Sequence, residues 1–141
     1  PDGSKILFTS SRGSGTDNEL YTSNPDGTGV VQLTDNEESE LFGAWSPDGS
    51  QIAFIRTFST GSNGVYVMNA DGTGVRFLAE TATSFGAPTW SPDGSQIAFQ
   101  RTISDSNTDL IKVNADGSGS ETNLTASSSF DGSPHWSPVM Q

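Results

Sequence analysis

The stretch WSPDGSQIAF occupies residues 45–54 and recurs without change at residues 90–99. A third copy begins at Trp136 and reads WSP, and residues 1–8, PDGSKILF, repeat the same stretch without its leading Trp and Ser. An internal period of about 20 to 50 residues is typical of repeat architectures, in which every unit adopts the same local structure. The repeat therefore decides the fold class before any other feature of the sequence.

A second marker shares this period. Residues 23–29 read SNPDGTG, residues 68–74 read MNADGTG and residues 113–119 read VNADGSG. Asp-Gly pairs supply the positive φ angles that tight hairpins require. Short β-branched and aromatic runs lie between these turns, and no stretch has the spacing of an amphipathic helix. Each unit of the repeat is therefore predicted to be an antiparallel meander of four strands.

The strands follow from the positions of the turns. The first strand of a unit is predicted to end at Trp45, Trp90 or Trp136. The second strands are predicted at residues 5–10, 51–56 and 96–101, the third at 20–23, 65–69 and 110–114, and the fourth at 30–34, 75–79 and 122–125. A repeated four-stranded sheet of this length is the sequence form of a β-propeller blade. The chain is thus interpreted as one half-propeller, with repeat units 1–46, 47–91 and 92–138 and a short C-terminal tail 139–141.

The WSPDGSQIAF tract, followed by VYVMNADGTG and a closing FLA or QLT, resembles the repeat of TolB-type β-propellers. The resemblance extends from Pro1 to Pro138 and implies an all-β fold in a ring of typically six blades. It also implies a bacterial protein with protein partners, and it favours a periplasmic or extracellular location. TolB itself has more blades and an additional domain.

Three four-stranded blades are too few to close a ring, because propellers have about four to eight blades. The strand predicted to end at Trp136 is the one that the first blade lacks, and an open edge strand is a template for another chain. Two copies related by a two-fold axis would form a six-bladed homodimer. The residues predicted at this interface are Pro1, Ile6, Phe8, His135, Trp136 and Pro138. The alternatives are a piece of a longer propeller and a trimer of nine blades.

The composition excludes several classes of function. Six Lys and Arg residues against 17 Asp and Glu residues give a net charge of −11, which argues against nucleic acid and anionic membranes as partners. The apolar runs are far shorter than the roughly 20 residues of a membrane-spanning helix. Without cysteine there is no disulfide, thiolate metal site or cysteine nucleophile. The single histidine, His135, has no catalytic motif around it, so no catalytic residue is predicted; at the interface it would make assembly sensitive to pH.

Acidic residues are predicted to gather on one end of the ring, on the linkers that join the second strand to the third and the fourth to the next blade. The run DSNTD at residues 105–109 resembles the start of a calcium loop, but the glycine that an EF-hand needs is missing. Two hypotheses for a calcium site remain. One is a partial loop site of Asp105, Asn107 and Asp109, and the other is an ion on the ring axis held by Glu40 and Asp131 of both subunits. The alternative is that these acids only keep the surface soluble.

The sequence thus predicts a non-catalytic, self-assembling propeller that serves as a binding or scaffold module. Its acidic face would bind Ca²⁺ or a protein or peptide partner, and no cofactor is expected to be required. One alternative is a propeller enzyme that uses an axial divalent metal for carbohydrate or ester chemistry. Another is a purely structural unit without a ligand.

Overall fold

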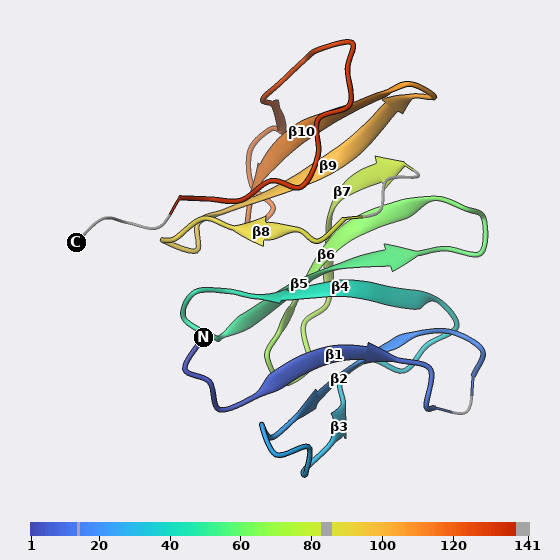
Figure 1. Cartoon of the computed structure of the whole chain (residues 1–141), viewed down its shortest axis with the longest axis vertical. Helices are drawn as coiled ribbons and strands as arrows, with labels where there is room; N and C mark the ends of the chain where they lie inside the picture. Colours follow the sequence, from blue (N-terminus) through green and yellow to red (C-terminus); the bar gives the residue numbers. More distant parts are fainter. Residues whose placement is uncertain (14, 83–85, 138–141) are drawn as a thin grey trace.

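The computed structural model describes residues 1–13, 15–82 and 86–137, which fold into three antiparallel sheets arranged side by side (Figure 1). The strands are β1 (Ile6–Ser10), β2 (Glu19–Ser23), β3 (Val31–Gln32), β4 (Ser39–Trp45), β5 (Gln51–Thr57), β6 (Asn63–Asn69), β7 (Arg76–Ala82), β8 (Thr89–Trp90), β9 (Gln96–Ser104), β10 (Asn107–Asn114) and β11 (Thr122–Asn123). Among these residues no helix has the length and hydropathy to cross a membrane. The all-β fold class is confirmed.

Strands that follow one another in the chain are neighbours in each sheet. The first sheet has the order β1-β2-β3, the second β4-β5-β6-β7 and the third β8-β9-β10-β11. All these pairings are antiparallel, as expected for strands joined by short hairpins. The second and third sheets are the predicted four-stranded meanders. The first sheet has three strands, because nothing in the described chain pairs with the edge of β1 that faces away from β2.

The Pro-Asp-Gly-Ser turns owe their shape to the residues of the repeated motif. Gly49 adopts a φ of 72°, which a residue with a Cβ rarely adopts. Asp48 Oδ1 accepts hydrogen bonds from Ser46 Oγ at 2.6 Å and from the backbone N of Ser50 at 3.0 Å. These bonds lower the pKa of Asp48 to about 2, and the bond from the Ser46 hydroxyl has the largest effect. The same contacts recur around Asp93, so the motif closes each hairpin in one way.

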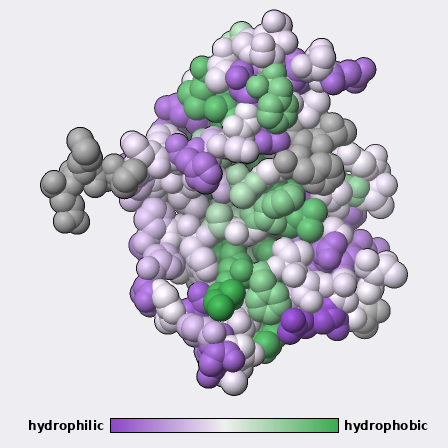
Figure 2. All heavy atoms as spheres, in the orientation of Figure 1, coloured by the Kyte–Doolittle hydropathy of each residue, from purple (hydrophilic) through white to green (hydrophobic). Residues whose placement is uncertain are grey.

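The core lies between the sheets. Between the first and second sheets, Leu20 packs with Ile52 and Phe54, and between the second and third sheets Val65 packs with Phe99. All five side chains are completely buried. Figure 2 shows an apolar band that crosses all three sheets on one face of the molecule. Each sheet therefore buries one face against its neighbour, as in stacked repeats.

Two predictions about strands need correction. The fourth strands of the first and third units are shorter than expected, since β3 and β11 have two residues each. The strand expected to end at Trp136 is not formed, because residues 131–137 have no strand beside them to complete a ladder. Pro138, a predicted interface residue, and the tail 139–141 lie outside the described residues.

Candidate functional site

The loops that follow β1 and β3 meet at one end of the molecule. The backbone N of Glu40 donates to the carbonyl O of Asn18 at 2.7 Å, and the backbone N of Asn18 donates to Ser39 Oγ at 3.1 Å. These bonds bring Glu19, the first residue of β2, next to Glu40 in β4. The predicted convergence of these linkers on one face is thereby observed for the first unit.

The first carboxylate cluster, as we name it, consists of Glu19, Asn36, Glu40 and Arg56. The backbone N of Asn36 donates to Glu19 Oε1 at 2.9 Å, and its Nδ2 donates to both carboxylate oxygens of Glu40 at 3.1 Å. Arg56 Nε forms an ion pair with Glu40 Oε1 at 2.6 Å. Glu40 is completely buried and Glu19 is 5% exposed. The cluster therefore holds two acids beside one guanidinium, away from bulk water.

This arrangement changes the ionisation of Glu19. Its Oε2 is buried and receives no hydrogen bond among the described residues. The pKa of Glu19 is raised to about 7. The larger cause is burial, and the second is the hydrogen bond that protonated Glu19 makes with Glu40. The hydrogen bonds of Thr34 and Asn36 act in the opposite direction but are outweighed. The first carboxylate cluster therefore exchanges a proton close to neutral pH.

A second carboxylate cluster, Asp109, Ser127 and Asp131, occupies the same places in the third unit. The backbone N of Ser127 donates to Asp109 Oδ1 at 3.3 Å, as that of Asn36 donates to Glu19. Ser127 Oγ donates to Asp131 Oδ2 at 2.8 Å, in the place of the Asn36 amide. The backbone N of Asp131 donates to the carbonyl of Thr108 at 2.7 Å. The two clusters are thus copies of one local design.

The second unit has no such cluster. Gly64 stands at the place of Glu19 and Thr81 at the place of Asn36, while the place of Glu40 falls on Phe85, which lies outside the described residues. The acidic residues are therefore unevenly distributed around the three units.

The predicted calcium ligands are partly brought together. Asp105 lies exposed in the two-residue turn between β9 and β10, so the DSNTD run forms a hairpin. Asn107 Nδ2 donates to the carbonyl of Ser127 at 2.7 Å, which places it beside Asp109 and Asp131. Glu40 belongs to the first carboxylate cluster instead. Within the described ranges no three His, Cys, Asp or Glu side chains are placed to hold a metal ion together.

A cavity of about 470 Å³ opens beside the first carboxylate cluster. Among its lining residues are four acids, Asp17, Glu19, Asp35 and Glu37. None of the described residues that line it is an arginine or a lysine. Carboxylates spread around a cavity of this size, without converging on one point, suit an organic cation such as a lysine or arginine side chain better than a bare metal ion.

The edge of β1 that faces away from β2 is open. Ile6 in β1 is 47% exposed, whereas Ile52 and Ile97, which occupy its place in the next two units, are completely buried. Phe8 is half-buried, whereas Phe54 and Phe99 at its place are not exposed at all. The difference arises because β5 is covered by β4 and β9 by β8, while β1 pairs with β2 alone.

Residues 131–137 share two features with the strands at the same place in the other units. Trp136 Nε1 donates to the carbonyl of Thr89 at 3.2 Å, as Trp90 Nε1 donates to Ala44 at 3.0 Å. Ser133 has a φ of 55°, matching the 56° of Phe42 at the bulge of β4. His135 precedes Trp136 and is exposed. The segment therefore repeats the indole hydrogen bond of β8 and the positive φ of β4, although it forms no ladder.

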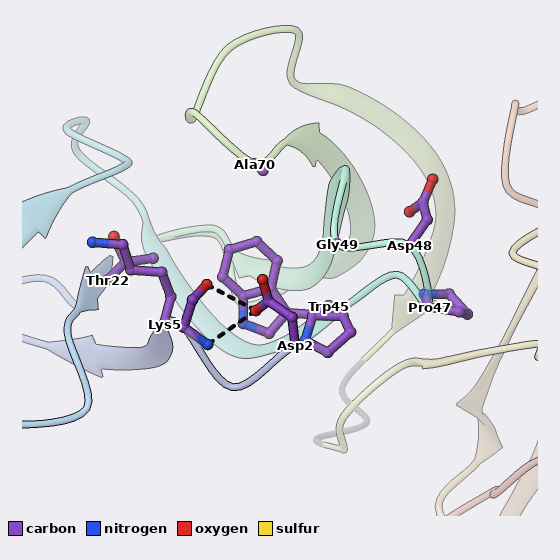
Figure 3. Close-up of a pocket in the computed structure, with 10 residues that line it drawn as sticks. Asp2, Lys5, Thr22, Trp45, Pro47, Asp48, Gly49 and Ala70 are labelled. Carbon is purple, nitrogen blue, oxygen red and sulfur yellow. Dashed lines mark hydrogen bonds between the residues drawn. The ribbon is translucent and has the colours of Figure 1, made fainter.

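The indole of Trp45 lies beside the open edge. No hydrogen bond from its Nε1 to a carbonyl is found in the described part of the chain, although both equivalent tryptophans make one. Instead Trp45 lines a cavity of about 560 Å³ together with Pro1 and Lys5. Figure 3 shows the indole in the middle of this lining, with Lys5 on one side and Pro47 and Asp48 on the other. The cavity is located where the missing inner strand of the first sheet would end.

Sequence reasoning named Glu40 and Asp131 but did not recognise that they occupy one place of the repeat. It also missed Asn36 and Ser127, which hold the carboxylates. Alignment of the first unit with the third would have found the pattern, because both the Glu19 place and the Glu40 place carry an acid in each of these units.

Known proteins of similar fold support the resemblance seen in the repeat. The solved structure of a putative TolB from Agrobacterium tumefaciens matches with a TM-score of 0.75 at 23% identity, over 98% of this chain and 52% of that one. TolB from Acinetobacter baumannii matches with a TM-score of 0.72 at 19% identity, over 87% of this chain and 31% of that one. At these identities the likeness shows the fold alone.

A dipeptidyl-peptidase 5 of Porphyromonas gingivalis is 51% identical over 37 residues, which are 26% of this chain and 5% of that protein. The chain thus spans about half the length, or less, of the proteins it matches. The family model of the TolB beta propeller domain matches residues 3–140, and the chain therefore belongs to that family.

Proposed function

We propose that this chain is a non-catalytic binding module that pairs with a second copy to form a six-bladed propeller. The observation that carries the proposal is the open edge of β1 together with the unpaired segment 131–137. The edge of β1 lacks a neighbouring inner strand, and segment 131–137 lacks a strand to pair with. The pairing of β4 with β5 inside the chain provides the geometry for their union.

That pairing fixes the register expected between two copies. In β4 and β5, Trp45 lies opposite Ile52 and Ala44 lies opposite Ala53. The same register places Trp136 of one copy opposite Ile6 of the other. It covers the exposed Ile6 side chain, and it offers the carbonyl before Trp136 to the Trp45 indole. Burial of apolar surface at about 25 cal/mol per Å² favours such a union.

The two-fold arrangement has a simple geometric basis. Three blades and three blades make six, within the range of known propellers. Each copy gives its 131–137 segment and receives that of the other, so the two seams are identical and no edge remains open. A periplasmic or extracellular location is the setting that we infer from the TolB-type family.

The acidic end of this ring is the proposed binding face. A net charge of −11, the two carboxylate clusters and the acidic cavity favour a partner protein or peptide that presents lysine or arginine. Catalysis is not part of the proposal, because the sequence holds no cysteine and its one histidine, His135, is exposed at the seam.

Light scattering measures the decisive quantity, the mass of the 141-residue chain in solution. We expect about 30 kDa, twice the chain mass of 14.8 kDa. Ile6→Lys places a charge opposite Trp136 and is expected to shift the mass toward that of the single chain. A folded particle of single-chain mass at micromolar concentration contradicts the proposal.

A matched control is available on the outer edge of the same sheet. Val31 in β3 is 51% exposed, close to the 47% of Ile6. Val31→Lys introduces the same charge away from the seam and is expected to leave the mass of the parent unchanged. Equal loss of mass in both variants would indicate that general destabilisation, and not the seam, separates the copies.

A further inference from the structure

We infer that, in the proposed six-bladed assembly, Arg12 of each copy forms an ion pair with Asp131 of the partner subunit. The inference rests on the proposed function, since both seams require a second copy. This ion pair would add a charged contact to a seam that otherwise consists of backbone pairing and apolar contact.

The template is the ion pair between Glu40 and Arg56. These residues lie directly opposite one another in β4 and β5, and Arg56 Nε is 2.6 Å from Glu40 Oε1. The guanidinium of Arg56 also lies 4.8 Å from the ring centre of Tyr66 and 5.9 Å from that of Phe54. The boundary between the first and second units is thus closed by an acid on an inner strand and an arginine held over two aromatic rings.

The third unit presents the acid of such a pair. Asp131 occupies the place of Glu40, and its backbone N donates to a carbonyl at 2.7 Å, the same distance as for Glu40. Ser127 Oγ donates to Asp131 Oδ2. No cationic side chain in the described part of the chain lies within ion-pair distance of Asp131. The carboxylate is therefore held in position but has no cationic partner among the described residues.

The first unit presents the cation. Ser10 stands at the place of Arg56, and Arg12 Nε donates to Ser10 Oγ at 3.0 Å. The Arg12 guanidinium lies 4.8 Å from the ring centre of Phe8 and 5.3 Å from that of Tyr21. Phe8 and Tyr21 are the counterparts of Phe54 and Tyr66, so the Arg12 guanidinium occupies the region that Arg56 occupies in the next unit.

The boundary between the second and third units acts as an internal control. The sequence has Phe85 at the place of Glu40. The guanidinium of Arg101, the counterpart of Arg56, lies 5.5 Å from the ring centre of Phe99, and its Nε donates to the carbonyl of Glu80 at 2.6 Å. Its two terminal nitrogens bind Glu121 of its own unit at 2.6 and 2.8 Å. Where the acid is absent, the arginine pairs inside its own unit. At the seam the acid is present, and Arg12 has no carboxylate within ion-pair distance in the described chain.

Charge reversal tests the pair. We expect Arg12→Glu alone and Asp131→Arg alone each to raise the dimer dissociation constant, measured by analytical ultracentrifugation, by about 10-fold or more. The double variant Arg12→Glu/Asp131→Arg is expected to return to within about 3-fold of the parent. High salt should reduce the effect of the single reversals, since screening weakens charge interactions.

Lys112→Glu serves as the control, because it makes the same change of charge in β10, away from the seam. Unfolding temperatures of all variants are recorded to show that each chain is folded. If the parent is a dimer and neither single reversal changes its dissociation constant, the ion pair is wrong, but the proposed function is not contradicted. A parent that is monomeric throughout overturns both.

Discussion

Glu19 and Glu40 share a buried site with a single guanidinium, that of Arg56. If both carboxyl groups were ionised, the site would carry a net negative charge away from water, which is unfavourable. Glu19 therefore keeps its proton up to a pKa of about 7, compared with an ordinary value of 4.5. Because the folded chain binds this proton more tightly than the unfolded chain, the free energy of unfolding decreases as the pH rises through this range.

Replacement of Glu19 tests this linkage. The carboxamide in Glu19→Gln keeps a donor toward Glu40 at every pH. At pH 8 we expect the variant to unfold at a temperature about 3 °C or more above the parent, and at about pH 4, below the ordinary pKa of 4.5, to unfold together with the parent. Scanning calorimetry at one protein concentration gives both values. Glu37→Gln, in the exposed part of the loop between β3 and β4, should not differ from the parent in its pH dependence. A pH-independent gain for Glu19→Gln would contradict the shifted pKa.

At the scale of the element, the repeated turn between the first and second strands stabilises the hairpins through its side chains. The pKa of Asp48 is about 2 in the folded chain, below the ordinary 3.8, because Ser46 and Ser50 donate hydrogen bonds to the carboxylate. The stabilisation by this carboxylate is therefore present above about pH 4 and is lost as the pH falls toward 2.

The turn therefore predicts a pH-dependent effect of mutation. Asp48→Ala is expected to lower the midpoint of urea unfolding at pH 5. The decrease should be smaller at pH 3, because part of the stabilisation by the Asp48 carboxylate is then lost in the parent. Asp105→Ala, which removes an exposed acid from the β9–β10 turn, is the control and should change neither midpoint. A deficit for Asp48→Ala that grows on acidification would show that the carboxylate is not the stabilising group.

Sequence alone predicted the elements well where a turn motif marks both ends of a hairpin. The β5, β6, β9 and β10 strands contain the predicted ranges, because Asp-Gly turns and β-branched runs determine them locally. The strand at Trp136 could not be judged in this way, since a strand exists only through the ladder beside it. The contact between Glu19 and Glu40 was missed for a similar reason: it depends on two loops that meet in space.

At the scale of the whole molecule, the acidic face is organised by internal donors. In the first carboxylate cluster Arg56 and Asn36 bind the oxygens of Glu40. In the second cluster Asn123 and Ser127 bind those of Asp109. Calcium prefers six to eight oxygen ligands, roughly, and would have to displace these donors. The proposed basic protein partner would not need to displace them.

Calcium therefore provides a test of the acidic face. We expect the unfolding temperature and the mass in solution to be the same in millimolar calcium as in excess EDTA. Differential scanning fluorimetry and light scattering give the two readouts. Magnesium at the same concentration controls for the general screening of a chain with a net charge of −11. A rise of several degrees with calcium alone would instead establish a metal site.

The absence of a carboxylate cluster from the second unit has a consequence for how a ligand would meet the ring. In the proposed dimer the third unit of one copy lies next to the first unit of the other, so the acids would gather in two lobes, each spanning a boundary between the two polypeptides. A polycation lying across a lobe touches both subunits, so its affinity is thermodynamically linked to their association. Dilution of the protein would then weaken capture of the polycation, and the polycation would in turn hold the ring together.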